Sequence, residues 1–469
     1  MEKPFSRELW WFSRLSALFA LSCIPLLVCG YGSDGDAWRI AYAADRLWNA
    51  GEYTPSRPPG YPLHELIMAP LVAFGGSLLT NTATLAATLV LVAVWKRFTD
   101  AHAFNPRILL TTLPFAPGLW ENAASTMDYN WSLLFLLLAF MFSLRLAPVA
   151  TASLLALAVG FRPANIVALV PLAVPFLLSD DRLRCTARFL LSSIVFSCAV
   201  FIPVVLSHGV SEYIETLVQQ TRVFRWTTLE RFALFAYRSV YAVGPIAVGV
   251  AIVLLFKGWK KHWERLRHKR SLVLTSLAFV FCYLCFFLLF PLEREYLLPA
   301  LPFLLILVDA VASRRELIVF CLSLVSFSLV NPDVVRHEGV RGRPGFNLRV
   351  GSYIEELQAR YELAERRKQL ADLSVSGRCI IMAGSSQSMW FDNEAFALDS
   401  LKPLPGIVDP TVHYRKNPDA HVVDALGISQ IRDAVAGGYR VHCFAPAAAY
   451  LEWLLGVSLT ELGVTVLPP

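Results

Sequence analysis

The chain has 469 residues, of which 56% are hydrophobic and only 17% are charged, and its mean hydropathy is +0.52. This composition excludes an ordinary soluble domain and predicts an α-helical polytopic membrane protein. The formal net charge of +6 does not indicate a nucleic-acid partner, because the basic residues stand in short clusters between apolar runs, as they do in cytoplasmic loops. We therefore expect membrane lipids as neighbours and no nucleic acid.

The first apolar run covers about residues 15–30 and follows Lys3, Arg7 and Arg14. Because many apolar runs follow it, we interpret it as an uncleaved first transmembrane helix with a cytoplasmic N-terminus, not as a signal peptide. Residues 63–74 are too short to cross and contain His64 and Glu65, which is typical of a half-embedded segment.

Further runs come close to the twenty or so apolar residues that a crossing needs, and several end at basic residues. They predict about eleven spans in all. An odd number of spans places the C-terminal region outside the cytoplasm. After the first, the predicted spans are 78–95, 107–119, 131–144, two compact spans flanking 160–163, 189–206, 240–256, 271–290, 296–311 and 317–330.

From Asn331 the composition is that of a soluble domain, so we divide the chain into a membrane domain, 1–330, and an extracytoplasmic domain, 331–469. Residues 351–373 are rich in charge and carry apolar residues at helical spacing. The stretches RCIIMAG, YRVHCFA and GVTVLP read as strands separated by helical segments. This pattern predicts a small α/β domain.

The first outer loop, 31–62, holds the candidate chemistry. It carries Asp34 and Asp36, then an amphipathic helix over 36–51, then Arg57 before a Pro-Pro-Gly-Tyr-Pro turn. One interpretation is structural: Ser33 or Asp34 caps the helix, and Asp36 complements its dipole. The other is catalytic, with a carboxylate at the membrane surface acting as a base.

The order of these features resembles the first outer loop of the GT-C superfamily. These integral-membrane glycosyltransferases use polyprenyl-phosphate sugars and include lipid A aminoarabinose transferases and protein O-mannosyltransferases. In their pattern an Asp opens the loop helix, an Arg follows three residues later, a Gly closes the helix, and a basic-Pro-Pro motif follows. The matching positions here are Asp36, Arg39, Gly51 and Arg57.

Asp128 in a later outer loop and the run Arg294-Glu295-Tyr296-Leu297-Leu298-Pro299 extend the resemblance. The pattern's common Asp-Glu pair is Asp36-Ala37 here, which leaves Asp34 as an alternative base. The resemblance implies a hexosyl- or pentosyltransferase that moves a sugar, with inversion, from a lipid-phosphate donor to a hydroxyl group of a lipid, glycan or protein acceptor.

Under this resemblance each candidate residue has an expected role. The catalytic carboxylates are Asp36, Asp34 and Asp128, and cations with a hydroxyl donor hold the leaving phosphate. The phosphate-binding candidates are Arg57, Arg294 and Tyr296, and the further pocket candidates are Arg39, Tyr61, His64 and Glu65.

Structural alternatives stand beside these roles. Arg57 could anchor a loop to lipid headgroups, Asp128 could cap the next helix, and Arg294 could pair with the glutamates on either side of it. Arg162, at the end of a span before Pro163, reads as a structural or headgroup contact. His64 and Glu65 could be a half-exposed polar pair.

No His/Cys cluster indicates a metal site, and the outer acids could bind a divalent cation only if they converge in space. The rival function is a transporter or flippase of a lipid-linked or anionic substrate, which needs charged residues near the middle of the membrane. The predicted span centres are almost free of charge. A non-catalytic assembly factor is the third reading. A bacterial inner membrane and cell-envelope glycan biosynthesis are the expected setting.

Overall fold

The computed structural model describes residues 4–210, 227–261, 267, 269–336, 344–372, 377–383, 386–399 and 411–467. The chain forms two compact units. The membrane unit comprises Met1–Tyr31 and Ala43–Gln358, and the C-terminal unit comprises Gly32–Tyr42 and Ala359–Pro469. The division thus falls at 358/359, and the first outer loop contributes to both units. Each unit is described by itself.

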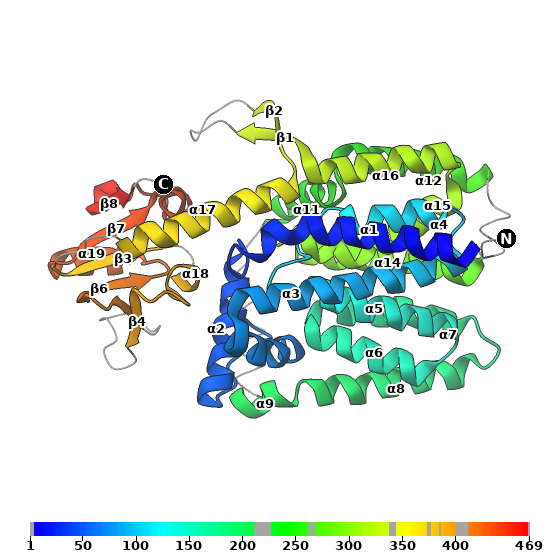
Figure 1. Cartoon of the computed structure of the whole chain (residues 1–469), viewed down its shortest axis with the longest axis horizontal. Helices are drawn as coiled ribbons and strands as arrows, with labels where there is room; N and C mark the ends of the chain where they lie inside the picture. The colour runs from blue at the N-terminus through cyan, green and yellow to red at the C-terminus, as the bar shows by residue number, and fades with distance from the viewer. Residues whose placement is uncertain are drawn as a thin grey trace. The chain divides into compact units, whose positions relative to one another are not determined.

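Most of the long helices of the membrane unit, among them α1, α3, α5, α6 and α8, run along one common direction (Figure 1). Its described elements are α1 (Pro4–Leu27), the second half of α2 (Gly35–Ala50), α3 (Pro62–His102), α4 (Pro106–Thr112), η1 (Leu113–Phe115), α5 (Tyr129–Leu144), α6 (Pro148–Phe161), η2 (Pro163–Ala168), α7 (Leu169–Leu177), α8 (Arg182–Val200), α9 (Ile202–His208), α11 (Thr228–Val243), α12 (Pro245–Lys261), α14 (Arg270–Leu289), η3 (Arg294–Ala300), α15 (Leu301–Val311), α16 (Arg314–Leu329) and the hairpin β1 (Val330–Arg336) with β2 (Pro344–Val350).

Among the described residues, four helices are long and apolar enough to cross a membrane, namely α1, α3, α8 and α14. The pair α11 and α12, bent by 91°, makes a fifth candidate if it counts as one span. The expectation of about eleven spans is therefore wrong as a count of full-length helices. Other apolar runs form shorter helices, among them α5, α6 and η2 with α7.

Proline explains why several runs are divided. Arg162 adopts an extended conformation, with φ −148° and ψ 105°, because the following Pro163 disfavours a helical residue before it. The next turn starts as the 3-10 helix η2, so this run yields two short helices. Further along, η3 contains Pro299 and precedes α15. Within α3 a break at Gly76, where φ is +54°, separates the expected half-embedded segment from the expected span.

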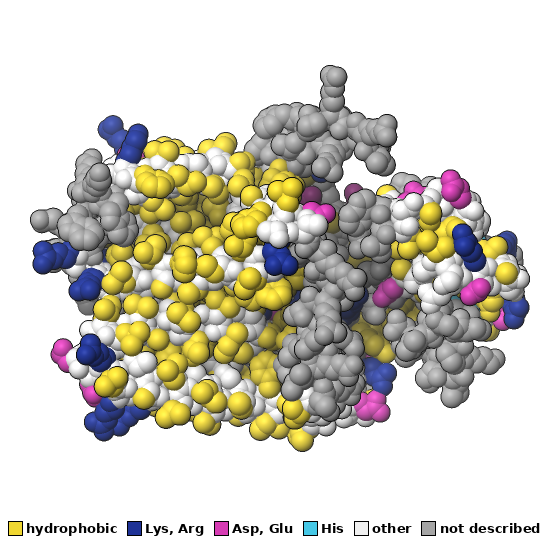
Figure 2. All heavy atoms as spheres, turned by 180° about the vertical axis from the view of Figure 1, so that it is seen from behind, with side chains coloured by type: hydrophobic (Ala, Val, Ile, Leu, Met, Phe, Trp, Pro, Cys, Tyr) yellow, Lys and Arg dark blue, Asp and Glu magenta, His cyan; other side chains and the backbone are white. Residues whose placement is uncertain are grey.

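The lateral surface of the membrane unit is apolar. On the face seen in Figure 2, hydrophobic side chains cover most of this unit, and Lys and Arg gather at one end. Exposed side chains include Leu183 at 82%, Phe256 at 80% and Leu191 at 65%. Exposed apolar surface of this extent indicates association with a membrane.

The C-terminal unit is built on a six-stranded sheet of order β4-β5-β6-β3-β7-β8. Strands β6, β3, β7 and β8 are parallel, and β4 and β5 are antiparallel additions at one edge. The division at 358/359 falls inside α17 (Ser352–Asp372), whose larger, C-terminal part belongs to this unit. The other elements are β3 (Cys379–Met382), α18 (Ser386–Trp390), β4 (Phe396–Asp399), β5 (Thr411–Tyr414), β6 (Asn417–Val423), α19 (Ile428–Ala436), β7 (Arg440–Phe444), α20 (Ala445–Leu455), η4 (Thr460–Leu462) and β8 (Val464–Leu467).

The predicted helix and the three predicted strands of this region are α17, β3, β7 and β8, so the expectation of a small α/β unit is confirmed. Its core combines strand residues such as Met382 and Cys443 with Ile431 of α19 and Leu451 of α20. Strands β4, β5 and β6 were not expected from the sequence.

Candidate functional site

The Pro-Pro turn before α3 is held in place by one buried carboxylate. Glu65, 1% exposed, accepts hydrogen bonds from the Tyr53 hydroxyl (2.5 Å), the Ser56 hydroxyl (2.6 Å) and the Ser56 backbone N–H (2.7 Å). Gly60 completes the turn with φ +97°, and a Cβ there would lie 3.0 Å from Val204. Glu65 is therefore a structural residue of the loop and not half-exposed, and it fixes the backbone that carries Arg57.

Asp128 lies at the centre of a buried ion cluster. Its Oδ1 accepts from Arg57 at 2.5 Å, and its Oδ2 accepts from Arg162 at 2.8 Å. The Asp128 side chain is 0% exposed, and those of Arg57 and Arg162 are 10% and 2% exposed. Asp128 occupies the residue before α5, yet its side chain makes no capping bond, so the capping interpretation is wrong. We call these three side chains, with the aromatic rings packed on them, the arginine cluster.

Aromatic rings surround the two guanidinium groups. Arg162 lies 4.0 Å from the ring centroid of Tyr129 and 4.7 Å from that of Tyr296, while Arg57 lies 4.0 Å from that of Tyr61. The Tyr129 hydroxyl donates to Glu293 at 2.7 Å. Each ring presents a negative face to a cation and excludes water from it. The cluster is therefore preorganised before any ligand binds.

The electrostatics of the cluster favour an ionised Asp128. Burial acts to raise the pKa of Asp128, but the positive charges of Arg162 and Arg57 outweigh it and hold the pKa below its usual range. Burial raises the pKa of Tyr296, so its phenol stays protonated at neutral pH and can donate a hydrogen bond. The arrangement suits an anionic ligand that meets guanidinium and phenol donors together.

His64 is fully buried in the first turn of α3, and its ring centroid lies 6.1 Å from that of Phe161. Neither ring nitrogen has a hydrogen-bond partner among the described residues. A buried polar group without a partner costs free energy, so such a group calls for a bound water or ligand. His64 is therefore not the half-exposed residue that the sequence suggested.

A second buried ion group lies at the start of η3. Arg294 contacts Glu121 at 3.1 Å and Glu295 at 2.9 Å, so two carboxylates share one guanidinium. The expectation that Arg294 pairs with neighbouring glutamates is confirmed for Glu295, and Glu121 is the partner that the sequence did not reveal. Burial raises the pKa of Glu121 to about 7, because Arg294 offsets only part of the desolvation.

This pKa predicts a pH-dependent stability. Between about pH 4.5 and 7 the folded protein keeps a proton on Glu121 that the unfolded chain has lost, so the free energy of unfolding falls as the pH rises through this window. The full loss is about 3 kcal/mol. We expect Glu121→Gln to flatten the dependence, measured as the thermal unfolding midpoint in detergent from pH 5 to 8.

The matched control for this experiment is Glu362→Gln, which changes a glutamate whose side chain is 70% exposed. Its curve should follow that of the wild type. A Glu121→Gln curve as steep as the wild type's would show that another group titrates.

An apolar cavity of about 300 Å³ borders the same turn. Helices α11, α12, α14 and α15 supply most of its wall. From η3, the lining residues are Arg294, Glu295, Leu297, Leu298 and Ala300. A hydrocarbon chain fits such a lining, and the only charged groups on it are those of Arg294 and Glu295 among the lining residues.

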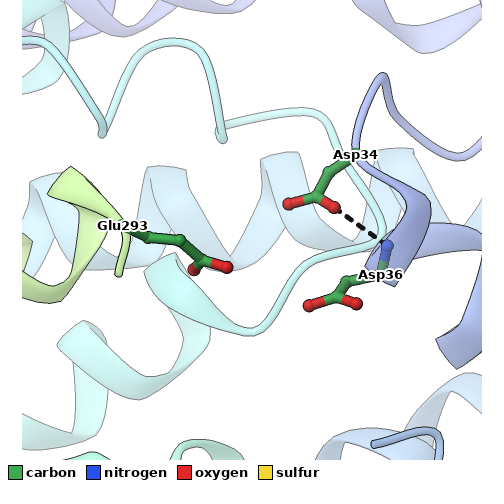
Figure 3. A group of neighbouring side chains, drawn as sticks. All are labelled: Asp34, Asp36 and Glu293. Atoms are coloured by element: carbon green, nitrogen blue, oxygen red, sulfur yellow. Dashed lines mark hydrogen bonds between the residues drawn. The ribbon is translucent and has the colours of Figure 1, made fainter. Parts of the chain in front are cut away.

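Residues Asp34–Asp36 of the first outer loop, which we call the acidic turn, belong to the C-terminal unit. The Asp34 carboxylate accepts the backbone N–H of Asp36 at 2.9 Å, as Figure 3 shows, and so caps α2 as the structural reading expected. Asp36 pairs with Arg39 at 3.3 Å, and its side chain is 18% exposed. Glu293, also drawn in Figure 3, belongs to the membrane unit. A divalent cation held by the outer acids stays a prediction.

The membrane unit brings Arg57, Tyr61, Asp128 and Tyr296 into one cluster, whereas Arg294 lies in the separate pair with Glu121. Arg162 was not expected to be a site residue. Its signal was a lone cation at the end of the apolar run Pro148–Phe161, directly before a proline. Such a cation is costly unless it is paired.

The chain matches no family model, no curated protein and no solved structure.

Proposed function

We propose that this chain is an integral-membrane glycosyltransferase of the GT-C type, which moves a sugar from a polyprenyl-phosphate donor to a hydroxyl group of a lipid, glycan or protein acceptor. The observation that carries the proposal is the position of η3. Its Tyr296 faces Arg162 in the arginine cluster, and its Leu297 and Leu298 line the apolar cavity. A donor of this class has the same two parts, an anionic phosphate and a hydrocarbon chain.

The phosphate is held by Arg57, Arg162 and Tyr296. As the glycosidic bond breaks, its electron pair goes to the phosphate oxygen, and preformed cationic and phenolic donors stabilise that charge. Asp128 is a positioning residue in this scheme, because both of its oxygens are occupied by guanidinium groups and its pKa is low. It sets the orientation of the two arginines.

Asp36 remains the base that we propose from the sequence. Its carboxylate takes the proton of the acceptor hydroxyl while the acceptor oxygen bonds to the anomeric carbon, and a single displacement of this kind inverts that carbon. Asp36 suits this role better than Asp34, whose carboxylate already caps α2. The partial exposure of Asp36 leaves it accessible to an acceptor.

The reaction face is proposed to be extracytoplasmic. Exposed basic residues follow or precede several helices of the membrane unit. By the positive-inside rule, we assign the end of the bundle where these residues gather to the cytoplasm. The start of α3 lies at the end of the bundle opposite the N-terminus (Figure 1), which supports an extracytoplasmic position for the arginine cluster. These exposed residues include Arg97, Arg145, Arg182, Arg184, Arg188, Arg314 and Arg315.

The proposal is tested with purified protein, a panel of radiolabelled polyprenyl-phosphate sugars and native membrane extract. We expect label to move from one donor to a new acceptor. With no transfer from any donor by well-folded protein, a transporter or flippase of a lipid-linked substrate becomes the better reading, and uptake into vesicles would then be measured.

The proposed binding of the donor's hydrocarbon chain in the apolar cavity can be tested by a substitution in the cavity wall. Ala251 of α12 is 5% exposed and lines the cavity, so Ala251→Phe would fill part of the space meant for the hydrocarbon chain. We expect the KM for a long-chain donor to rise about tenfold with little change in kcat, since about 1.4 kcal/mol of chain burial corresponds to a tenfold loss of binding.

Val253→Phe is the matched control, because Val253 lies on the same helix but is 48% exposed. This variant should keep the wild-type KM. Equal KM values for the wild type and Ala251→Phe would remove the cavity from the donor site.

A further inference from the structure

The first part of α2 is packed as a piece of the C-terminal unit. Residues Gly32–Tyr42 group with Ala359–Pro469, although more than three hundred residues separate them in the chain. A helix of 16 residues in a protein gains most of its stability from tertiary packing and little from its own propensity. The acidic turn therefore depends on its packing partners for order.

Trp38 is a buried residue that connects the acidic turn to the rest of the C-terminal unit. It is 3% exposed, and its indole Nε1–H donates to the Gly32 carbonyl at 2.9 Å. This bond joins the first turn of α2 to Gly32 near the start of the loop, and Asp34 and Asp36 lie between the two bonded residues. Whatever fixes Trp38 also restricts the conformation of both carboxylates.

Arg367 of α17 fixes Trp38. Its guanidinium carbon lies 4.2 Å from the centroid of the Trp38 ring. The same guanidinium donates to the carbonyls of Ser388 at 2.7 Å, Phe391 at 2.9 Å and Asp392 at 3.1 Å. One side chain thus ties the end of α18 to the indole, with three hydrogen bonds that orient it over the ring.

A second contact supports the first. The ring of Tyr42, one helical turn after Trp38, meets the rings of Trp390 and Phe391 edge-on, with centroids 5.2 Å and 5.9 Å apart. Trp390 and Phe391 are 9% and 8% exposed. Edge-to-face pairs of this kind stabilise beyond the apolar area they bury. The segment following α18 is held by Arg367 and presents the rings that receive Tyr42.

We propose that the C-terminal unit orders the acidic turn of the first outer loop, and that Arg367 is the positioning residue that does so through Trp38. The consequence for catalysis rests on the proposed transferase function, whereas the ordering itself does not. Anything that displaces the Arg367 contact would loosen the turn and slow the reaction without touching the membrane unit.

The test is hydrogen exchange of the full-length protein in detergent. We expect Arg367→Ala to speed exchange of the backbone amides in 36–42 by about tenfold, because a cation–π contact and three oriented hydrogen bonds are lost together. Amides of β3 and β7 report whether the sheet stays folded. Arg366→Ala is the matched control, since Arg366 on the same helix pairs with Glu362 at 3.5 Å and should leave 36–42 unchanged.

A double-mutant cycle guards against a trivial loss of folding. In a Trp38→Leu background, where the ring is absent, Arg367→Ala should speed the exchange of 36–42 no further. Additive effects, or wild-type exchange in Arg367→Ala with an intact sheet, would overturn the proposal. If the sheet itself loses protection in Arg367→Ala, Trp38→Leu alone carries the test, because it removes the same contact from the other side. Wild-type exchange of 36–42 in Trp38→Leu with an intact sheet would then overturn the proposal.

Measurements of sugar transfer test whether the ordering of the acidic turn matters for catalysis. We expect Arg367→Ala to lower kcat about fivefold with an unchanged KM for the donor, and Arg367→Lys to recover part of it, because lysine keeps the cation over the ring but not the three hydrogen bonds. If Arg367→Ala speeds exchange of the amides in 36–42 but leaves kcat unchanged, Arg367 orders the acidic turn but has no positioning role in catalysis. A protein without any transfer would instead count against the proposed function, and the exchange data would still stand.

Discussion

Replacing Asp36 with asparagine is expected to lower kcat for sugar transfer by about 10²- to 10⁴-fold, the contribution typical of a general base. Asparagine keeps the shape of the side chain and removes the carboxylate that accepts the acceptor's proton. It also weakens the pair with Arg39, which is partly exposed and contributes little to stability. The variant should therefore elute as folded protein from a gel-filtration column in detergent.

The control for this prediction lies on the same helix. Asp45 is paired with Asn49 near the solvent, and Asp45→Asn should retain wild-type transfer. Activity of Asp36→Asn within a few fold of the wild type would move the base to Asp34 or out of this turn. The pair Asp34→Asn and Asp36→Asn, assayed side by side, separates these two outcomes.

Replacing Asp128 with asparagine is expected to destabilise the membrane unit by about 3–5 kcal/mol. The substitution leaves two guanidinium groups facing one another in a buried site without the charge that compensates them. It should lower the thermal midpoint of the purified protein by several degrees, measured by the loss of the folded-protein peak in gel filtration after heating. Transfer should fall as well, since the arginines lose their orientation.

Asp100→Asn is the control, because Asp100 forms an exposed ion pair with Lys96 on α3 and such pairs contribute little. A second variant shows whether charge is the cause. Arg162→Gln combined with Asp128→Asn should be less unstable than the sum of the two single changes, because it removes one of the uncompensated cations. Additivity would mean that the cluster acts through packing alone.

The two buried ion groups show how far local patterns reach. The sequence marked Arg57, Asp128 and Tyr296 because of short motifs, and the structure places them in one cluster. It marked Arg294 with them, yet that side chain pairs with Glu121. Spacing along the chain fixes which turn carries a residue, but the direction of a side chain depends on partners from distant segments.

The number of membrane-spanning helices was predicted less well than the residues of the arginine cluster. Hydropathy identifies apolar runs, but a run is not a single helix when a proline or glycine divides it. The breaks at Pro163 and Gly76 fall where the sequence already divided the apolar runs, so they do not account for the excess in the predicted number of spans. The expectation of about eleven spans counted apolar runs such as 107–119, 131–144 and 296–311 as full crossings, whereas the longest helix among them has 16 residues.

The amino-acid sequence by itself determined the membrane character, the helix of the first outer loop, and the α/β character of the C-terminal segment with three of its strands and α17. These follow from composition and periodicity, which are local properties. Only the tertiary structure decided that Arg162 completes the arginine cluster, that Glu121 shares Arg294, and that Arg367 packs on Trp38. Each of these contacts joins residues more than thirty positions apart. A buried charge is stable only when it is paired, and its partner can come from any segment that the fold brings next to it.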